Sequence, residues 1–172
     1  MADTAAKKLE RKYLTHWLNP TFEISDTAAY TRLGKDLEAF SVELNPEVET
    51  TRNILGENSV QHSGYKVTAD ADPFYYYEND DLAQKVLDIA LGRLTGDECK
   101  TQYLDVVLSP GEEGAEPTVV VAWREDVYVV PTSYGGDTSG VQTPFTVHFA
   151  GNRTEGTFNL QTKVFTPNST AL

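Results

Sequence analysis

The sequence predicts a mainly β fold with one flanking α-helix, either an antiparallel β-sandwich or a half-barrel. About eight segments rich in β-branched and aromatic residues alternate with turn residues, and one further segment has helical periodicity. The chain has 172 residues, of which 40% are apolar and 23% charged, so it can bury a core and is not compositionally disordered. We therefore expect a single domain over residues 1–172.

The first strand is predicted within residues 7–19, KKLERKYLTHWLN. This segment opens with charged residues and then alternates, so that Tyr13, Thr15 and Trp17 share one face of a strand. Pro20 ends the segment, because proline lacks the N–H that a continuing strand would donate.

Residues 30–44, YTRLGKDLEAFSVEL, predict two short strands joined by a turn at 34–36. The polar ribbon that follows, residues 43–68, is harder to assign. It alternates too regularly to be a linker and carries too much charge for a core strand, and Pro46 interrupts it near its start. A ribbon with polar faces could close a sheet across subunits.

One helix is predicted within residues 78–97, ENDDLAQKVLDIALGRLTGD. Asn79 or Asp80 can cap its start, Arg93 falls in its last turn, and Gly96 is a suitable stop. Apolar residues recur at three- and four-residue spacing, which predicts one apolar face: Leu82, Ala83, Val86, Leu87, Ala90, Leu91 and Leu94. We expect Leu82, Val86, Ala90 and Leu94 to pack the helix against the outside of a sheet.

Five strand-like segments follow the helix, at residues 101–108, 118–123, 126–134, 141–150 and 156–165. An acidic loop, SPGEEGAEP, joins the first two. Residues 151–153, Gly-Asn-Arg, are predicted to form the turn of a hairpin whose arms are PFTVHF and GTFNLQ.

The charge balance argues against binding a nucleic-acid backbone. The chain carries 14 Lys and Arg against 26 Asp and Glu, a formal net charge of −12, whereas phosphate neutralisation needs clustered cations. A protein that lets nucleic acid pass without adhering could have this balance, and so could any soluble acidic protein. The first residues do not resemble a signal peptide and no apolar run is long enough to span a bilayer, so we expect synthesis in a cytoplasm.

No catalytic, cofactor or metal signature stands out. His16, His62 and His148 lie in different segments without ligand spacing. Cys99, the only cysteine, follows two acidic residues that would raise its pKa, so we expect a partly buried small residue. The acids from Asp70 onward fail the twelve-residue calcium loop, whose fifth and sixth positions would be Phe74 and Tyr75. A looser cation site stays open.

Several segments together resemble the major tail tube protein of long-tailed (siphovirus-type) phages of Gram-positive bacteria. They are, in order, RKYLTHWLN, YTRLGKDLEAFSVELNPEVETTRNILGENSV, GYKVTADADPFYYYENDDL with the helix after it, and VQTPFTVHFAGNRTEGTFN. The resemblance covers nearly the whole chain, and RLGKDLEAFSVELNPEVETTRNILGE is its most specific part.

The resemblance implies a structural virion protein rather than an enzyme. Such proteins assemble as hexameric rings that stack into the hollow tail, through which DNA leaves the capsid without specific binding. The implied partners are the chain itself and the tape measure, tail tip and terminator proteins, with no membrane and no cofactor. The implied location is the phage tail, after synthesis in the host cytoplasm.

The resemblance also implies roles for particular segments. Residues 40–44 and 60–68 would be inner strands, and residues 45–58 an extended loop between subunits or rings. Arms would lie at about residues 1–12 and 165–172. The candidates for lining the lumen are Glu43, Glu47, Glu49, Asp70 and Asp72. The candidates for contacts between subunits or rings are Asn45, Pro46, Thr50, Thr51, Arg52, Asn53, Ile54 and Leu55.

Three alternatives remain. The chain could form the inner tube of a contractile tail or of a phage-derived bacteriocin, which a neighbouring sheath gene would indicate. It could be a monomeric β-sandwich that binds carbohydrate or decorates a capsid, which would stay monomeric in solution. An enzyme ranks last, because no nucleophile–base or metal constellation is visible.

Overall fold

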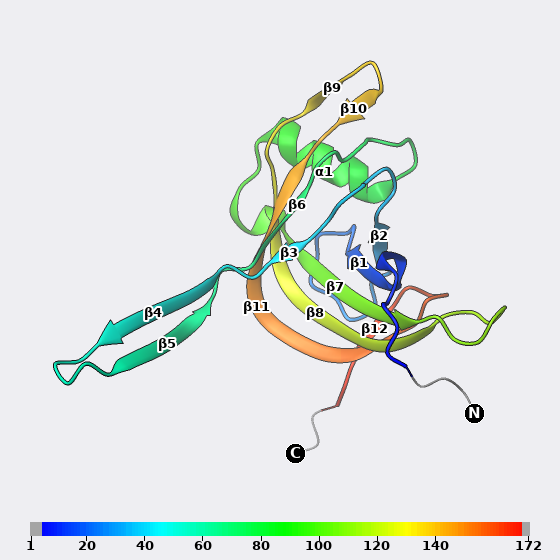
Figure 1. Ribbon diagram of the computed structural model, residues 1–172. Helices are drawn as coiled ribbons and strands as arrows, with labels where there is room; N and C mark the ends of the chain where they lie inside the picture. The colour runs from blue at the N-terminus through cyan, green and yellow to red at the C-terminus, as the bar shows by residue number, and fades with distance from the viewer. Residues whose placement is uncertain (1–4, 170–172) are drawn as a thin grey trace.

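The computed structural model describes residues 5–169, and its main feature is one antiparallel sheet of eight strands that curls into a half-barrel (Figure 1). The strand order is β2-β1-β7-β8-β11-β6-β3, and β12 also pairs with β11. The strands are β1 (Leu14–Leu18), β2 (Thr31–Leu33), β3 (Val42–Glu43), β6 (Thr68–Ala71), β7 (Lys100–Ser109), β8 (Thr118–Pro131), β11 (Phe145–Phe158) and β12 (Phe165–Pro167). This confirms the predicted mainly β fold, in its half-barrel form.

Two hairpins stand apart from the main sheet. They pair β4 (Pro46–Arg52) with β5 (Asn58–Tyr65), and β9 (Gly135–Asp137) with β10 (Gly140–Gln142). The helical elements are α1 (Asp81–Gly92) and two 3-10 turns, η1 (Arg11–Tyr13) and η2 (Gly96–Cys99). Within residues 5–169, no helix has the length and hydropathy needed to cross a membrane.

Both faces of the sheet are covered by apolar clusters, as the residues of β1 show. Leu18 and Trp17 point to opposite faces, yet both are buried, each in a different apolar cluster. The first cluster lies between the sheet and α1, and the second lies under the C-terminal strand. The larger members of the first are Leu18, Phe22, Phe40, Leu82, Val86, Ile89, Tyr103, Phe145 and Val147; those of the second are Trp17, Tyr30, Leu104, Val106, Phe158 and Phe165.

The helix begins as predicted, because Asp80 caps it. One carboxylate oxygen of Asp80 accepts hydrogen bonds from the backbone N–H groups of Leu82 (3.1 Å) and Ala83 (3.2 Å). The helix ends at Gly92, earlier than predicted, and Arg93 takes the left-handed conformation of a C-terminal cap, with φ of 50°.

The predicted apolar face of α1 is correct at its start and displaced toward its end. Leu82 and Val86 are buried, and Ala90 and Leu94 are half-buried. Ile89, which the predicted face omitted, is buried, whereas Leu91 is exposed. The reason is the 3.6-residue period: Leu82, Val86 and Ile89 follow one stripe, and Leu91 lies outside it.

Two predicted turns are wrong, because the chain continues through both as strand. Residues 118–123 and 126–134 were expected to be separate strands, but β8 runs from Thr118 to Pro131 and pairs with β7 throughout the interval. Residues 151–153 do not reverse the chain either. They bend β11, which shifts register against β8 on both sides of Gly151 but pairs with it before and after.

The predicted terminal arms contain short regular elements within the described residues. The N-terminal arm, predicted at about residues 1–12, runs into η1, and residues 165–167 of the C-terminal arm form β12, which pairs with β11. The C-terminal segment is ordered because the ring of Phe165 is buried in the second cluster. Residues 1–4 and 170–172 of these arms lie outside the described residues.

Candidate functional site

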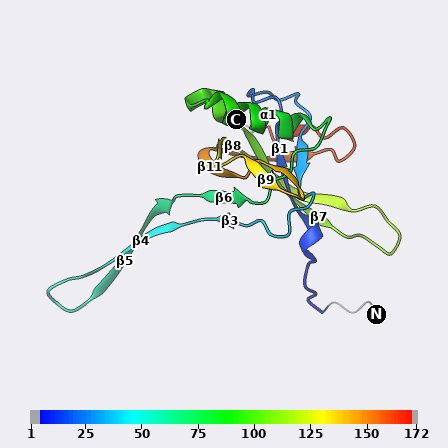
Figure 2. The same ribbon diagram turned by 90° about the horizontal axis from the view of Figure 1, so that it is seen from above.

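The most conspicuous candidate is the hairpin of β4 and β5, hereafter the arm, which projects away from the half-barrel (Figures 1 and 2). Every residue of its two strands is exposed except Gly64, which is half-buried. The extended loop predicted at residues 45–58 is therefore a β-hairpin. Pro46 does not break it, because proline is tolerated as the first residue of a strand.

Asn45 sets the direction of the arm at its base. Its backbone is left-handed, with φ of 44°, a conformation that asparagine tolerates better than most residues. Its side-chain amide donates to the carbonyl of Lys66 (3.0 Å) and to the hydroxyl of Thr68 (3.2 Å). The N–H of Lys66 donates back to the carbonyl of Asn45 (3.2 Å). These bonds tie both strands of the arm to the start of β6.

The tip of the arm is held by Asn53. Its side-chain oxygen accepts from the N–H groups of Leu55 (2.9 Å) and Glu57 (3.0 Å), and its amide donates to the Glu57 carboxylate (2.8 Å). This turn presents Ile54 and Leu55 to solvent with exposed fractions of 102% and 77%. They are the most exposed large apolar side chains among residues 5–169.

The two faces of the arm differ in chemistry, as the strand register shows. Val48 lies opposite His62, Thr50 opposite Val60, and Pro46 opposite Tyr65, so these residues share one face. The ring of His62 meets that of Tyr65 edge-on, with centroids 4.6 Å apart. Val48, Val60 and Tyr65 are all more than half exposed. We call this the apolar face of the arm.

The other face of the arm is acidic. Glu47 and Glu49 alternate with Val48 and so point the opposite way, with Glu49 opposite Gln61. Thr51 and Ser59, which lie opposite each other, belong to the same face. Lys66 forms an exposed ion pair with Glu47 (N–O 2.7 Å), and the pKa of Lys66 is raised by this hydrogen bond and charge.

The five lumen candidates fall into two groups and one isolated residue. Glu47 and Glu49 share the acidic face of the arm. Glu43 on β3 lies opposite Thr68 on β6, and Asp70 lies two residues after Thr68 on the same strand. Glu43 and Asp70 therefore share one face at the edge of the main sheet. Both are exposed, and the hydroxyl of Thr146 donates to Asp70 (2.7 Å). Asp72 lies beyond the end of β6.

The candidates for contacts between subunits all lie on the arm or at its base, but they do not share one face. Thr50 and Thr51 point to opposite faces, and Asn45 acts within the chain. Val48, Val60 and Tyr65 were not among the candidates. The signal that could have identified them is the position of Val48 between two glutamates, which indicates a strand with one apolar face.

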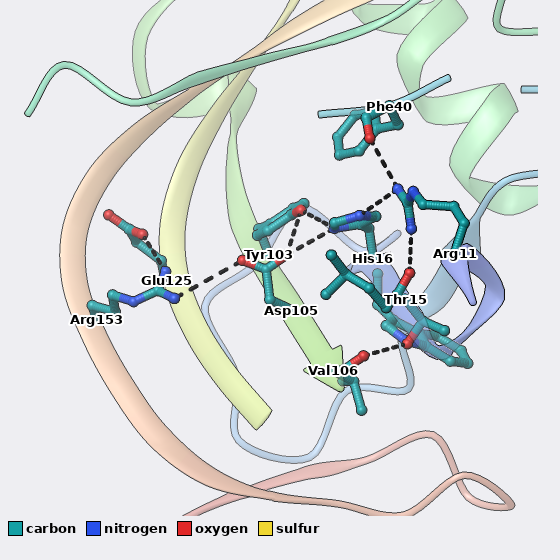
Figure 3. Close-up of polar contacts among 11 residues, drawn as sticks. Arg11, Thr15, His16, Phe40, Tyr103, Asp105, Val106, Glu125 and Arg153 are labelled. Atoms are coloured by element: carbon teal, nitrogen blue, oxygen red, sulfur yellow. Dashed lines mark hydrogen bonds and ion pairs between the residues drawn. The ribbon is translucent and has the colours of Figure 1, made fainter. Parts of the chain in front are cut away.

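A second candidate is a polar cluster that joins η1, β1, β7, β8 and β11 (Figure 3); His16, Tyr103 and Glu125 are buried, whereas Arg11 and Arg153 at its two ends are exposed. A terminal N–H of Arg11 donates to Nε2 of His16 (2.9 Å) and to the carbonyl of Phe40 (2.9 Å). Because a guanidinium group only donates, Nε2 of His16 must accept, and its Nδ1 then carries the proton. Nδ1 lies 2.7 Å from a carboxylate oxygen of Asp105, to which it donates.

The cluster continues from Asp105 to the next strands. The hydroxyl of Tyr103 donates to the same Asp105 oxygen (2.7 Å), and burial, followed by the charge of Asp105, raises the pKa of Tyr103 well above its usual value. Arg153 lies 4.0 Å from the other Asp105 oxygen and donates to the carboxylate of Glu125 (3.1 Å).

The geometry of this cluster favours a structural role. The His16 nitrogen that a general base would present to a substrate is bonded to Arg11. The cluster instead links five elements through hydrogen bonds and ion pairs, with the neutral His16 ring between Arg11 and Asp105. Sequence analysis missed it because its members are far apart in the chain; the one local signal was Asp105 within a valine-rich strand.

Two further expectations from the sequence concern Cys99 and a possible metal site. Cys99 is buried, more deeply than the partly buried position expected, and burial first and Glu98 second raise the pKa of its thiol. Among residues 5–169, no three His, Cys, Asp or Glu side chains gather closely enough to hold a metal ion.

Comparison with models of protein families finds no match to this chain, and comparison with curated proteins finds none either.

Proposed function

We propose that this protein is a structural subunit that polymerises through the arm into stacked hexameric rings, forming the tail tube of a long-tailed phage. The observation that carries the proposal is the arm itself: an ordered, projecting hairpin with one apolar face, one acidic face and an apolar tip. The resemblance of the sequence to tail tube proteins supplies the identity of the assembly.

The exposed apolar side chains of the arm support self-assembly. A two-stranded hairpin alone is marginally stable in water, and three or more strands or another packed element are needed to stabilise it. Within residues 5–169, Val48, Val60 and Tyr65 belong to neither apolar cluster and are more than half exposed. Burying them against another copy would yield about 25 cal/mol for each Å² of apolar surface removed from water.

The acidic face of the arm supports a role beside DNA. Glu47 and Glu49 point away from the apolar face, so one face can bind a neighbouring copy while the other faces a water-filled channel. Carboxylates there would repel phosphates and leave no gain from counterion release, so DNA would pass without adhering. Glu43 and Asp70 would extend this surface along the sheet edge where the arm begins.

Electron microscopy and size-exclusion chromatography of matched variants test the proposal. Wild-type protein is expected to form hollow rings or tubes as its concentration rises. Val48→Asp with Val60→Asp, on the apolar face, should remain folded and monomeric. Thr51→Asp with Ser59→Asp adds the same charge on the opposite face and should still assemble.

Two results would overturn the proposal. One is a wild-type protein that stays monomeric at every concentration and also after purified tail-tip complexes are added to initiate polymerisation. That result would favour the monomeric binding module. The other is equal assembly of the two variants, which would remove the arm from the interface.

A further inference from the structure

We propose that the tip of the arm binds in an apolar cavity at the carboxyl end of α1 in a neighbouring copy of this chain. Ile54 and Leu55 would fill the cavity, and Glu57 would pair with Arg93 at its rim. This inference rests on the proposed self-assembly and names the surface that receives the arm.

The cavity lies between the end of α1, η2 and the last residues of β8. Its volume is about 400 Å³, and its apolar wall includes Ile89, Leu94, Cys99, Tyr128, Val130 and Pro131. β7, which pairs with β8 on one side, begins only at Lys100 opposite Tyr128, so the last residues of β8 pair with β11 alone. Val130 consequently remains 42% exposed. The cavity is therefore an apolar opening that a second molecule can reach.

The tip has the complementary chemistry. Ile54 and Leu55 protrude from a turn that the side chain of Asn53 already holds in place. A preorganised turn loses less conformational entropy on binding than a flexible loop would. Two adjacent aliphatic side chains on a narrow support suit a concave apolar site, where burial of apolar surface drives association.

Charge complementarity gives the contact an orientation. Arg93 lines the cavity and has no carboxylate within ion-pair distance in residues 5–169. The left-handed backbone that ends the helix presents it at the rim. Glu57 follows Leu55 by two residues, and its carboxylate is bonded only to the Asn53 amide within the same part of the chain. An opposite charge beside an apolar contact selects the register of docking.

The arm cannot place its tip in the cavity of its own subunit. In both views it extends outward from the half-barrel and away from α1 (Figures 1 and 2). The contact therefore joins two different surfaces of two copies. Such head-to-tail contacts produce closed rings or open helical filaments, which is the geometry that a tube requires.

Disulfide trapping tests the contact directly. In a Cys99→Ser background, one sample carries Leu55→Cys and a second carries Val130→Cys; the two are mixed under assembly conditions and oxidised. Peptide mass spectrometry should find the disulfide between positions 55 and 130. As a matched control, Val120→Cys, also exposed on β8 but remote from the cavity, should give no such bond with Leu55→Cys.

A charge exchange between Arg93 and Glu57 provides a second, independent test. Arg93→Glu and Glu57→Arg should each raise the concentration needed for assembly by about tenfold or more, because like charges then meet. The variant carrying both changes should assemble as wild type does. Arg93 and Glu57 are exposed, so neither change should prevent folding.

The failure of this inference can be told apart from failure of the proposed function. Suppose that wild-type rings form but position 55 is not trapped at position 130, or that the double charge exchange does not restore assembly. The cavity is then not the acceptor of the tip, whereas the proposed tube stands. If wild-type protein does not assemble even with tail-tip complexes, both proposals fall together.

Discussion

Gly156 of β11 lies against the buried ring of Phe165 in β12. A Cβ at Gly156 would stand 2.5 Å from Cζ of that ring and would also collide with the carbonyl oxygen of Thr166. Glycine is required here because β12, which pairs antiparallel with β11, lies at a distance that leaves no room for a side chain. This close approach holds β12 on the sheet.

Gly156→Ala should therefore destabilise the protein by about 1–3 kcal/mol, because overpacking forces the buried ring and its strand to move. Urea unfolding followed by circular dichroism would measure the change. Thr157→Ala, one residue along on the exposed face, should have a smaller effect. Equal stability of Gly156→Ala and wild type would show that β12 relaxes without cost.

Asp105→Ala should also destabilise the protein, by about 1–3 kcal/mol, because it leaves the buried donors of His16 and Tyr103 without their acceptor. The same urea titration would detect it. Asp88→Ala, an exposed change on α1, should stay within about 0.5 kcal/mol of wild type. A cluster without structural importance would make the two variants indistinguishable.

Stability should fall at alkaline pH because two buried tyrosines resist ionisation in the folded state. Burial raises the pKa of Tyr30 from 10.0 to about 12, and that of Tyr103 well above 10.0. The unfolded chain releases these protons near pH 10, so the stabilising effect is complete below that pH. It is lost as the pH rises through the folded-state values.

The measurement is the free energy of unfolding as a function of pH, beside the tyrosinate absorbance of the native protein. Tyr30→Phe should reduce the loss of stability above pH 10, since it removes one of the two groups. An alkaline profile identical to that of wild type would contradict the role of Tyr30.

The acidic surface leads to a prediction about DNA passage. If the protein forms the proposed tail tube, phage particles carrying Glu43→Lys with Glu49→Lys should assemble tails but eject their genome more slowly, because two cations per subunit would bind phosphates in the channel. Ejection kinetics of purified particles would measure this. Glu112→Lys with Glu116→Lys makes the same charge change in the exposed loop between β7 and β8 and serves as the control. Unchanged kinetics in the first variant would remove Glu43 and Glu49 from the lumen.

Local features of the fold could be predicted well. The cap at Asp80 and the stripe through Leu82 and Val86 depend on residues within one or two helical turns, so a short segment contains the whole signal. The omission of Ile89 was an error in following that period. The alternation of residues 43–68 was too regular for a linker, yet the family resemblance implied an extended loop at residues 45–58, where the structure has a hairpin.

Features that depend on distant partners could not be predicted. Arg124 and Glu125 look like a turn in the sequence, but β8 continues through them because β7 and β11 pair with it on both sides. Glu125 is tolerated at a buried position because Arg153, 28 residues later, donates to it. No local pattern contains that pairing.

By itself, the sequence determined that the chain forms a mainly β domain with one capped helix and a polar, acidic ribbon. Composition, alternation and capping are properties of neighbouring residues. Only the tertiary structure decided that the ribbon is a free-standing arm, that Val48 and Glu49 lie on opposite sides of it, and that residues 151–153 bend a strand instead of ending it. These outcomes depend on strand register and on which faces find a buried partner, which are set by contacts between residues far apart in the chain.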